Sequence, residues 1–261
     1  MSGDRPPIPI EAAPDSVLAR AIEALSRFPT DQSWVLVGGI AVFIRLGSVT
    51  RPTADTDTVA RSQAELIDRL VADEITTVVA GGELRIPIRA GDVAVDVMDL
   101  ADDPLPGDDE RRAFALARRH ALSTAVMERI LVSHGGGAVV DATIPVASTS
   151  ALVALKTVSM VRRPHGNSPH KVGSDIHDLV RLVNDSGARA VAADLVSEGE
   201  LATCVADQIG RAFGNDLRYT LLRLRTNDRS AGAQVLSDAE VGAIVILADE
   251  LSQLLGSGGP R

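Results

Sequence analysis

The stretch GGIAVFIRLGSVTRPTADTDTVA, residues 38–60, contains the features that decide the fold. The apolar run WVLVGG (34–39) predicts a buried strand that turns at its two glycines into a short helix over 40–46. The segment ADTDTVA (54–60) predicts a strand with Asp55 and Asp57 on one face, because side chains alternate along a strand. Carboxylates this close repel each other, so we expect a cation between them.

The pattern around this stretch predicts a mixed α/β half up to about residue 147. Asp15 is a candidate cap for a helix over 15–28, and Ser62 with Glu65 forms a capping box that opens a helix to about residue 73. Alternating apolar residues predict further strands, and a helix follows the acidic loop after residue 100. The expected strands are 75–80, 84–90, 93–100, 125–133 and 138–146, and the expected helix is 110–122.

Helical patterns dominate after about residue 148, so we divide the chain into 1–147 and 148–261. Ser174 or Asp175 is the candidate cap of one helix, and Ser237 or Asp238 is the candidate cap of the last. The expected helices are 149–163, 175–184, 188–214 with a break, 216–226 and 238–255.

Composition limits the classes of function. Apolar residues make up 45% and aromatic residues 2%, so the core consists of aliphatic side chains. The net charge of −9 argues against a broad basic surface for nucleic acid. Cys204 is the single cysteine, which excludes an internal disulfide and fits a reducing cytoplasm. The polar, proline-rich start carries no signal peptide pattern, and the apolar run 241–248 is too short to span a membrane.

A third acid, Asp96, lies in VAVDVMD (93–99) between valines. On a buried strand it would be costly unless it were paired, protonated or bound to a metal. If its strand lies beside that of Asp55 and Asp57, three carboxylates converge, and such a site suits Mg²⁺ and phosphoryl transfer from a triphosphate. A lone Asp-x-Asp is usually a solvated turn, but the upstream Gly-Gly and the third acid favour the metal site. Asp99 has odd spacing from Asp96, which predicts the opposite sheet face.

Two further elements each have a structural and a functional interpretation. Gly38 and Gly39 form a tight turn, or offer backbone N–H groups at a helix start to phosphate oxygens. Lys156 is one of only two lysines and lies on an apolar helix face. It is either a surface lysine with a buried stem or a point charge for a triphosphate.

These residues resemble the nucleotidyltransferase superfamily related to DNA polymerase β. VGG (37–39), DTD (55–57) and VAVDV (93–97) match its signature in order, although Thr56 and Thr58 replace residues that are usually apolar. A second segment resembles the AbiEii-type nucleotidyltransferases, which include the mycobacterial MenT toxins. Its matching motifs are LVALK (152–156), Arg162-Arg163 and DIHDL (175–179).

The resemblance implies a polymerase β-like mixed sheet with flanking helices, followed by a helical domain that completes the site. It implies a toxin that transfers a nucleoside monophosphate from an NTP, with Mg²⁺, to the 3′ end of tRNA, and a cognate antitoxin. The implied catalytic residues are Asp55, Asp57, Asp96, Lys156 and Asp178, of which Asp55, Asp57 and Asp96 bind the metal. The implied nucleotide-binding residues are Gly38, Gly39, Thr53 and Lys156.

The sequence alone does not identify the acceptor of the nucleotidyl group. Arg162, Arg163 and Lys171 form a local basic loop, which is either solvated or binds RNA phosphates. The net acidity also suits a small-molecule nucleotidyltransferase of the aminoglycoside-modifying kind. A non-catalytic member that binds a nucleotide or a partner protein is the third alternative.

Asp178 also has more than one interpretation. It supports Lys156 or the substrate, or it caps its helix.

Overall fold

The structure is a computed structural model that describes residues 6–48, 55–78, 83–89, 91–100, 109–162, 169–220, 222 and 237–257. The chain forms two compact units. The first comprises residues 1–101 and 121–148, and the second comprises 102–120 and 149–261. The helix predicted over 110–122 thus begins in the second unit, although it precedes residue 147 in the sequence.

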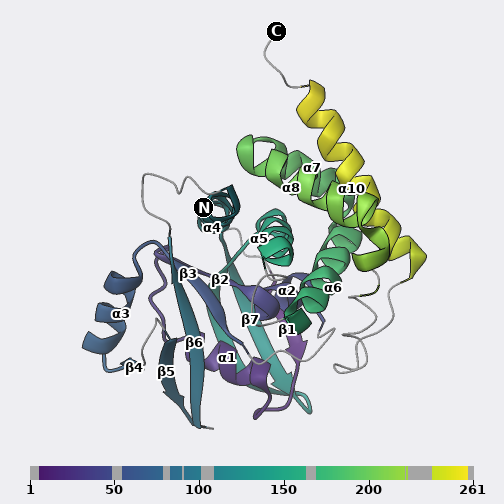
Figure 1. The fold of residues 1–261 in the computed structure, drawn as a ribbon. Coiled ribbons are helices and arrows are strands. Elements are labelled where there is room, and N and C mark those ends of the chain that lie inside the picture. The colour runs from purple at the N-terminus through teal and green to yellow at the C-terminus, as the bar shows by residue number, and fades with distance from the viewer. Residues whose placement is uncertain are drawn as a thin grey trace. The chain divides into compact units, whose positions relative to one another are not determined.

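In the described residues of the first unit, eight strands form a mixed sheet in the order β1-β7-β8-β2-β3-β6-β5-β4 (Figure 1). Three neighbouring pairs, β1/β7, β2/β8 and β3/β6, are parallel, and the other four are antiparallel. The expected α/β class is confirmed. The strands are β1 (Ile8–Glu11), β2 (Trp34–Val37), β3 (Asp57–Ala60), β4 (Thr77–Val78), β5 (Glu83–Ile88), β6 (Gly91–Asp99), β7 (Val126–His134) and β8 (Gly137–Val146).

The centre of this sheet is the strand β2 and the helix that follows it, α2 (Gly38–Leu46). All four residues of β2 are buried, as the continuous apolar run predicts. Trp34, the only tryptophan of the chain, donates its indole N–H to the Pro29 carbonyl at 2.7 Å. The helix ends at Gly47, whose φ of 63° is the left-handed conformation that glycine adopts readily.

Two more helices pack on the sheet, and their caps refine the sequence predictions. Helix α1 (Val17–Leu25) is capped by Ser16, which accepts from the Ala19 N–H, and not by Asp15. Helix α3 (Gln63–Ala72) is capped by Ser62 as predicted. Strand β1 was not predicted, because its four residues pair with β7 more than a hundred positions away.

Arg45 lies in the last turn of α2 and forms hydrogen bonds to the end of β8. Its guanidinium donates to the carbonyls of Val146 and Ala147, both at 2.8 Å, and pairs with the carboxylate of Glu128 on β7. Both charged side chains are largely buried. Beside them, the hydroxyls of Thr124 and Ser148 lie 2.8 Å apart. The two segments through which the chain enters β7 and leaves β8 are therefore held together.

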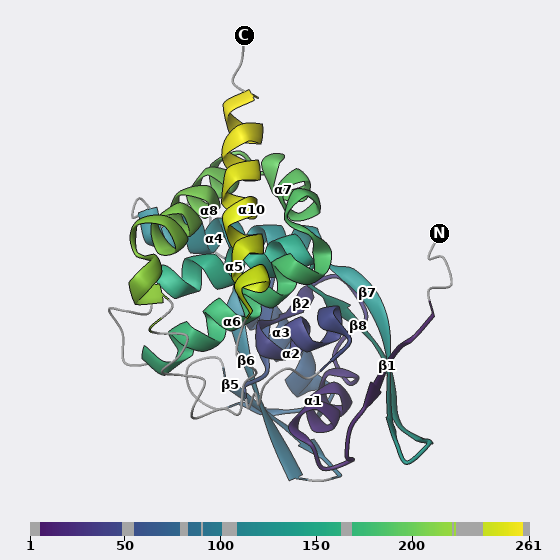
Figure 2. The same cartoon turned by 90° about the vertical axis from the view of Figure 1, so that its right-hand side faces the viewer.

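The second unit is helical in the part that the structure describes. Figure 2 shows α7, α8 and α10 side by side, and α10 packs on both of the others. None of the described helices is long and apolar enough to cross a membrane. The elements are α4 (Asp109–Ser123, whose last turn belongs to the first unit), α5 (Thr149–Arg162), α6 (Pro169–Ser186), α7 (Ala188–Val196), α8 (Glu200–Gly210), the π-helical turn η3 (Arg211–Asn215) and α10 (Asp238–Ser257).

Helix α6 begins six residues earlier than predicted. Pro169 stands at its first position, where the missing N–H costs nothing. Ser174 and Asp175 therefore lie inside the helix and do not cap it. At α10, Ser237 and Glu240 form a reciprocal capping box, with bonds of 2.8 and 3.3 Å, as the sequence allowed.

We predict that Arg45→Met lowers the free energy of unfolding of the first unit by about 3–5 kcal/mol, because it leaves a buried carboxylate uncompensated. The double variant Arg45→Met, Glu128→Gln should lose less. Urea titration followed by Trp34 fluorescence reports this unit directly. Arg69→Ala, which breaks the exposed pair with Asp31, is the control and should cost below about 1 kcal/mol. Equal losses in Arg45→Met and Arg69→Ala would contradict the assignment.

Candidate functional site

Asp57 and Asp96 lie directly opposite each other on neighbouring parallel strands. The register of β3 and β6 pairs Asp57 with Asp96, and the Asp96 N–H donates to the Thr56 carbonyl at 2.8 Å. The Thr58 hydroxyl donates to the Asp96 carbonyl at 3.1 Å and fastens the same two strands. Opposed residues project from the same sheet face, so the two carboxylates are neighbours. The predicted adjacency of the two strands is confirmed.

The exposure of these acids differs from the sequence prediction. Strand β6 buries Val93, Val95 and Val97 on one face, while Asp96 is exposed on the other. The expected cost of burying Asp96 therefore does not arise, and electrostatic repulsion is the constraint that remains. Asp55 is also exposed and lies two residues before the start of β3.

Gly38 brings the backbone against the Asp57 carboxylate. Its φ is 72°, and a Cβ at this position would lie 2.2 Å from Asp57 Oδ2. Only glycine therefore fits here, because any side chain would both strain the backbone and displace the carboxylate. The turn at 38–39 and the acid are parts of one local structure, and Gly39 is buried in the first turn of α2.

The donor chemistry of this face suits Mg²⁺. Carboxylate oxygens are hard ligands, and Mg²⁺ sites commonly use one or two carboxylates together with substrate phosphates and water. Among the described residues, no group of three or more His, Cys, Asp or Glu side chains is arranged to hold a metal by itself. The opposed pair of Asp57 and Asp96 fits a cation that a nucleotide helps to bind.

A second cluster of charges lies in the helical unit. Lys156 on α5 places its ammonium 3.0 Å from Asp175 Oδ1 and 2.7 Å from Asp178 Oδ2, both on α6. Asp175 and Asp178 lie on one helix face because of their i, i+3 spacing. The lysine side chain is 9% exposed and the two acids are almost completely buried. Lys156 is thus no surface lysine, and two of its three N–H donors face carboxylates.

His177 adds an imidazole to the buried cluster. Its Nδ1 lies 3.9 Å from Asp178 Oδ1, and neither ring nitrogen has a hydrogen-bond partner among the residues that the structure describes. Nearby, Arg181 pairs with Glu240 of α10 at 3.2 Å. Burial raises the carboxyl pKa of Glu240, but its hydrogen bonds with Ser237 and the charge of Arg181 together outweigh burial, so the pKa is lowered.

The remaining predicted residues are divided between the two units. Gly38, Gly39, Asp55, Asp57 and Asp96 belong to the first unit, and Lys156, Lys171 and Asp178 belong to the second. Arg162 ends α5, and Lys171 lies in the first turn of α6. Thr53 and Arg163 lie outside the described residues.

Two charged residues of these neighbourhoods escaped the sequence analysis. Asp175 was considered only as a helix cap, although its spacing from Asp178 is the signal that both acids face one partner. Glu83 on β5 pairs in register with Asp96. That pairing follows from the position of the tight turn between β5 and β6, which the sequence placed at 91–92, two residues too late.

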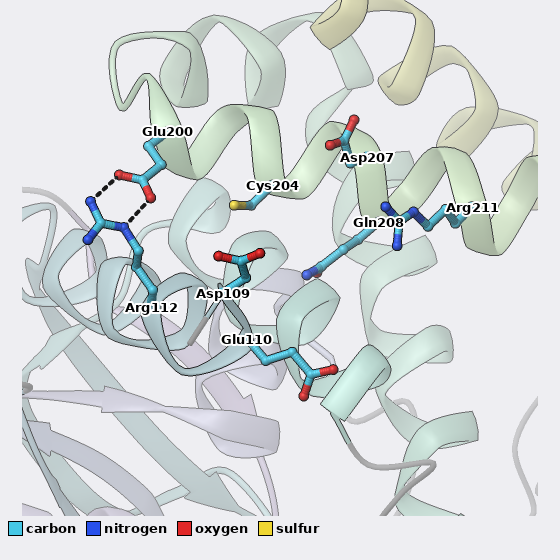
Figure 3. A pocket seen from close by; sticks show the side chains of 8 residues that line it. All are labelled: Asp109, Glu110, Arg112, Glu200, Cys204, Asp207, Gln208 and Arg211. Atoms are coloured by element: carbon cyan, nitrogen blue, oxygen red, sulfur yellow. Dashed lines mark hydrogen bonds and ion pairs between the residues drawn. The ribbon is translucent and has the colours of Figure 1, made fainter. Parts of the chain in front are cut away.

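A cavity of about 250 Å³ lies between α4 and α8 in the second unit (Figure 3). Arg112 and Glu200 form a bidentate pair on its wall, with Nη2 to Oε2 at 2.8 Å. Burial, and next to it the charge of Glu200, raises the pKa of the Cys204 thiol. None of the predicted site residues lines this cavity. Its lining consists of Asp109, Glu110, Arg112, Glu200, Cys204, Asp207, Gln208 and Arg211.

Comparisons with known structures give similar chains of low sequence identity. An antigenic nucleotidyltransferase-like protein from Paracoccidioides brasiliensis has 16% identity and a TM-score of 0.45, with 80% of this chain and 93% of that chain covered. A nucleotidyltransferase described as putative from H. pylori has 11% identity and a TM-score of 0.44, with coverages of 94% and 96%. JHP933 from Helicobacter pylori has 12% identity and a TM-score of 0.46, with coverages of 92% and 91%.

A family model gives the decisive match. No curated protein sequence matches the chain. The model described as nucleotidyl transferase AbiEii toxin, Type IV TA system, matches residues 20–240, which is most of the chain. The motifs in both units lie within this range. The chain therefore belongs to the AbiEii nucleotidyltransferase toxin family.

Proposed function

We propose that this protein transfers a nucleoside monophosphate from an NTP to the 3′ hydroxyl of tRNA and releases pyrophosphate. The main observation behind the proposal is that Asp57 on β3 and Asp96 on β6 lie opposite each other in register. Gly38 lies so close to the Asp57 carboxylate that no side chain fits at this position. Membership in a family of nucleotidyltransferase toxins from type IV toxin–antitoxin systems supports nucleotidyl transfer as the class of reaction. The reaction belongs in the cytoplasm, where NTPs and tRNA meet, and a cognate antitoxin would restrain it.

Asp57 and Asp96 would hold Mg²⁺, with Asp55 beside them. The ion supplies positive charge that offsets the carboxylates and the triphosphate and favours ionisation of the attacking hydroxyl. The acceptor oxygen forms a bond to the α-phosphorus while the bond from this phosphorus to the β-bridging oxygen breaks. The hydroxyl proton passes to a carboxylate oxygen of the same face, and the backbone N–H groups at 38–39 face the phosphate oxygens.

The choice of tRNA as acceptor is supported by the family resemblance of the motifs. The net charge of −9 favours instead a cationic small acceptor, such as an aminoglycoside. Incubation with each α-labelled NTP, Mg²⁺ and either total tRNA or an aminoglycoside panel separates the two. Label on tRNA supports the proposal, and label on the small acceptor alone replaces it.

We predict that Asp57→Asn and Asp96→Asn each lower nucleotidyl transfer by about a thousandfold, because several kcal/mol of charge stabilisation is lost. Thermal stability without Mg²⁺ should stay equal or rise, since a repelling carboxylate is removed. Asp92→Asn is the matched control, because Asp92 lies four residues before Asp96 on the same strand face. Unfolded Asp57→Asn or Asp96→Asn protein at room temperature would show that these acids are structural.

We predict that Gly38→Ala abolishes transfer, since its methyl group displaces the Asp57 carboxylate. Gly47→Ala is the matched control. Its φ of 63° imposes a similar backbone strain of about 1–3 kcal/mol, but no atom lies within 4 Å of the new Cβ. Gly47→Ala should lose stability through backbone strain alone in Trp34-monitored unfolding and keep its activity, while Gly38→Ala loses activity and, because of the added clash, at least as much stability. Full activity of Gly38→Ala would refute the proposed link to Asp57.

Lys156 contributes to the proposed reaction from a buried ion cluster. We assign it a role in binding the triphosphate, with Asp178 and Asp175 holding the ammonium in place. The cluster is also a structural element, because removal of the cation leaves two carboxylates buried without it.

We predict that Lys156→Ala lowers the free energy of unfolding by about 3–5 kcal/mol, and that the double variant Lys156→Met, Asp178→Asn recovers part of this loss. Denaturation followed by far-ultraviolet circular dichroism measures both. The control Arg129→Ala breaks an exposed pair with Asp141 and should cost below about 1 kcal/mol. Among variants that stay folded, Lys156→Arg should bind NTP weakly, because guanidinium and ammonium differ in shape. Wild-type stability and turnover in Lys156→Ala would refute both roles.

A further inference from the structure

The face that carries Asp57 and Asp96 continues onto β5 with an acid and a base. The register of β5 and β6 pairs Glu83 with Asp96 and Arg85 with Ala94. Residues two apart on a strand project from the same face, and opposed residues share it. Arg85 therefore projects from the same sheet face as Asp57 and Asp96, diagonal to Asp96. Strands are spaced about 4.8 Å apart, so the row from Asp57 to Glu83 spans about 10 Å.

Arg85 is bound to Glu83 by a weak contact. The distance from Arg85 Nη2 to Glu83 Oε1 is 2.7 Å, but Glu83 Oε1 has no donor in hydrogen-bond geometry among the described residues. The side chains are 45% and 33% exposed. Ion pairs of this exposure contribute little stability, so a stronger anion can replace the carboxylate.

A cation beside this face would favour nucleotide binding. Asp57, Asp96 and Glu83 place three carboxylates in register, and a nucleotide brings several more negative charges to them. Two other arginines of the first unit have partners elsewhere, Arg45 with Glu128 and Arg20 with the carbonyl of Asp92. A guanidinium binds phosphate oxygens through two parallel N–H donors, which suits the exchange.

We propose that Arg85 binds the triphosphate of the nucleotide on the Asp57–Asp96 face, and that Glu83 holds Arg85 until the nucleotide displaces it. The inference rests on the proposed function and adds a nucleotide-binding residue to that site. Glu83 is a competitor of the substrate for one guanidinium. Its removal therefore strengthens nucleotide binding, whereas removal of Arg85 weakens it, and this opposite pair of effects distinguishes the proposal from a structural ion pair.

The test is isothermal titration of the full chain with Mg²⁺ and inorganic tripolyphosphate, and then with each NTP. Arg85→Ala should bind both about ten- to a hundredfold more weakly, the loss expected for charged hydrogen bonds. Glu83→Gln should bind about two- to fivefold more tightly, since an exposed ion pair is removed. Arg85→Lys should fall between Arg85→Ala and the wild type. The control Arg129→Ala, which breaks an exposed arginine–carboxylate pair on β7 and β8, should bind as the wild type does.

Several outcomes would overturn the inference. Unchanged tripolyphosphate binding in Arg85→Ala refutes it, as does a Glu83→Gln variant that binds as weakly as Arg85→Ala. Weakened tRNA binding in Arg85→Ala without any change toward tripolyphosphate shows an RNA contact and also overturns it. Circular dichroism melting of each variant confirms that the fold is retained. The expected binding pattern without transfer to any acceptor would uphold the role of Arg85 while refuting the proposed function.

Discussion

Electrostatic repulsion between carboxylates on one sheet face is the constraint on which the first unit depends. Asp57, Asp96 and Glu83 occupy opposed positions on β3, β6 and β5, so the backbone pairing of the sheet forces like charges together. The hydrogen bonds of Thr58 and of the Asp96 N–H hold this register against the repulsion. A cation near this face would lower the repulsion between the carboxylates, and carboxylate oxygens are ligands that Mg²⁺ accepts.

The helical unit also brings two carboxylates together, but it compensates their charge with a buried lysine. Asp175 and Asp178 are also close together, but they are buried and share the ammonium of Lys156. Burial raises the cost of any missing partner, whereas the exposed row on the sheet is screened by water. The same residue types thus form an exposed row on the sheet and a buried, internally compensated cluster between α5 and α6.

Local sequence patterns predicted the elements that depend on neighbours along the chain. The β2–α2 turn at Gly38-Gly39, the end of α2 at Gly47 and the cap of α3 at Ser62 all follow from propensities within a few residues. The alternation of Val93, Val95 and Val97 indicated a strand, yet valines around Asp96 suggested burial on both faces. Whether the second face of a strand is covered depends on tertiary packing, which alternation alone does not reveal.

Features that join distant segments could not be predicted from such patterns. The pairing of Ile8–Glu11 with β7, the register that opposes Glu83 to Asp96 and the bond from Lys156 to Asp175 all depend on contacts across sequence gaps. The early start of α6 shows a related limit. Ser174 and Asp175 are residue types that often cap helices, but both lie within α6.

The parallel pairing of β2 with β8 and of β1 with β7 also determines when the sheet can be completed during synthesis. The strands that carry Asp57, Glu83 and Asp96 lie within about forty residues of one another along the chain, so their pairing needs no later part of the sequence. β2 gains its second neighbour only after residue 146 has been made, and β1 gains its partner only after residue 134. Contacts of such long range slow folding, because a large loop must close before they form. The nascent chain therefore exposes the buried edge of β2 while α4, β7 and β8 are translated, and this interval is when the growing toxin is most susceptible to aggregation and proteolysis.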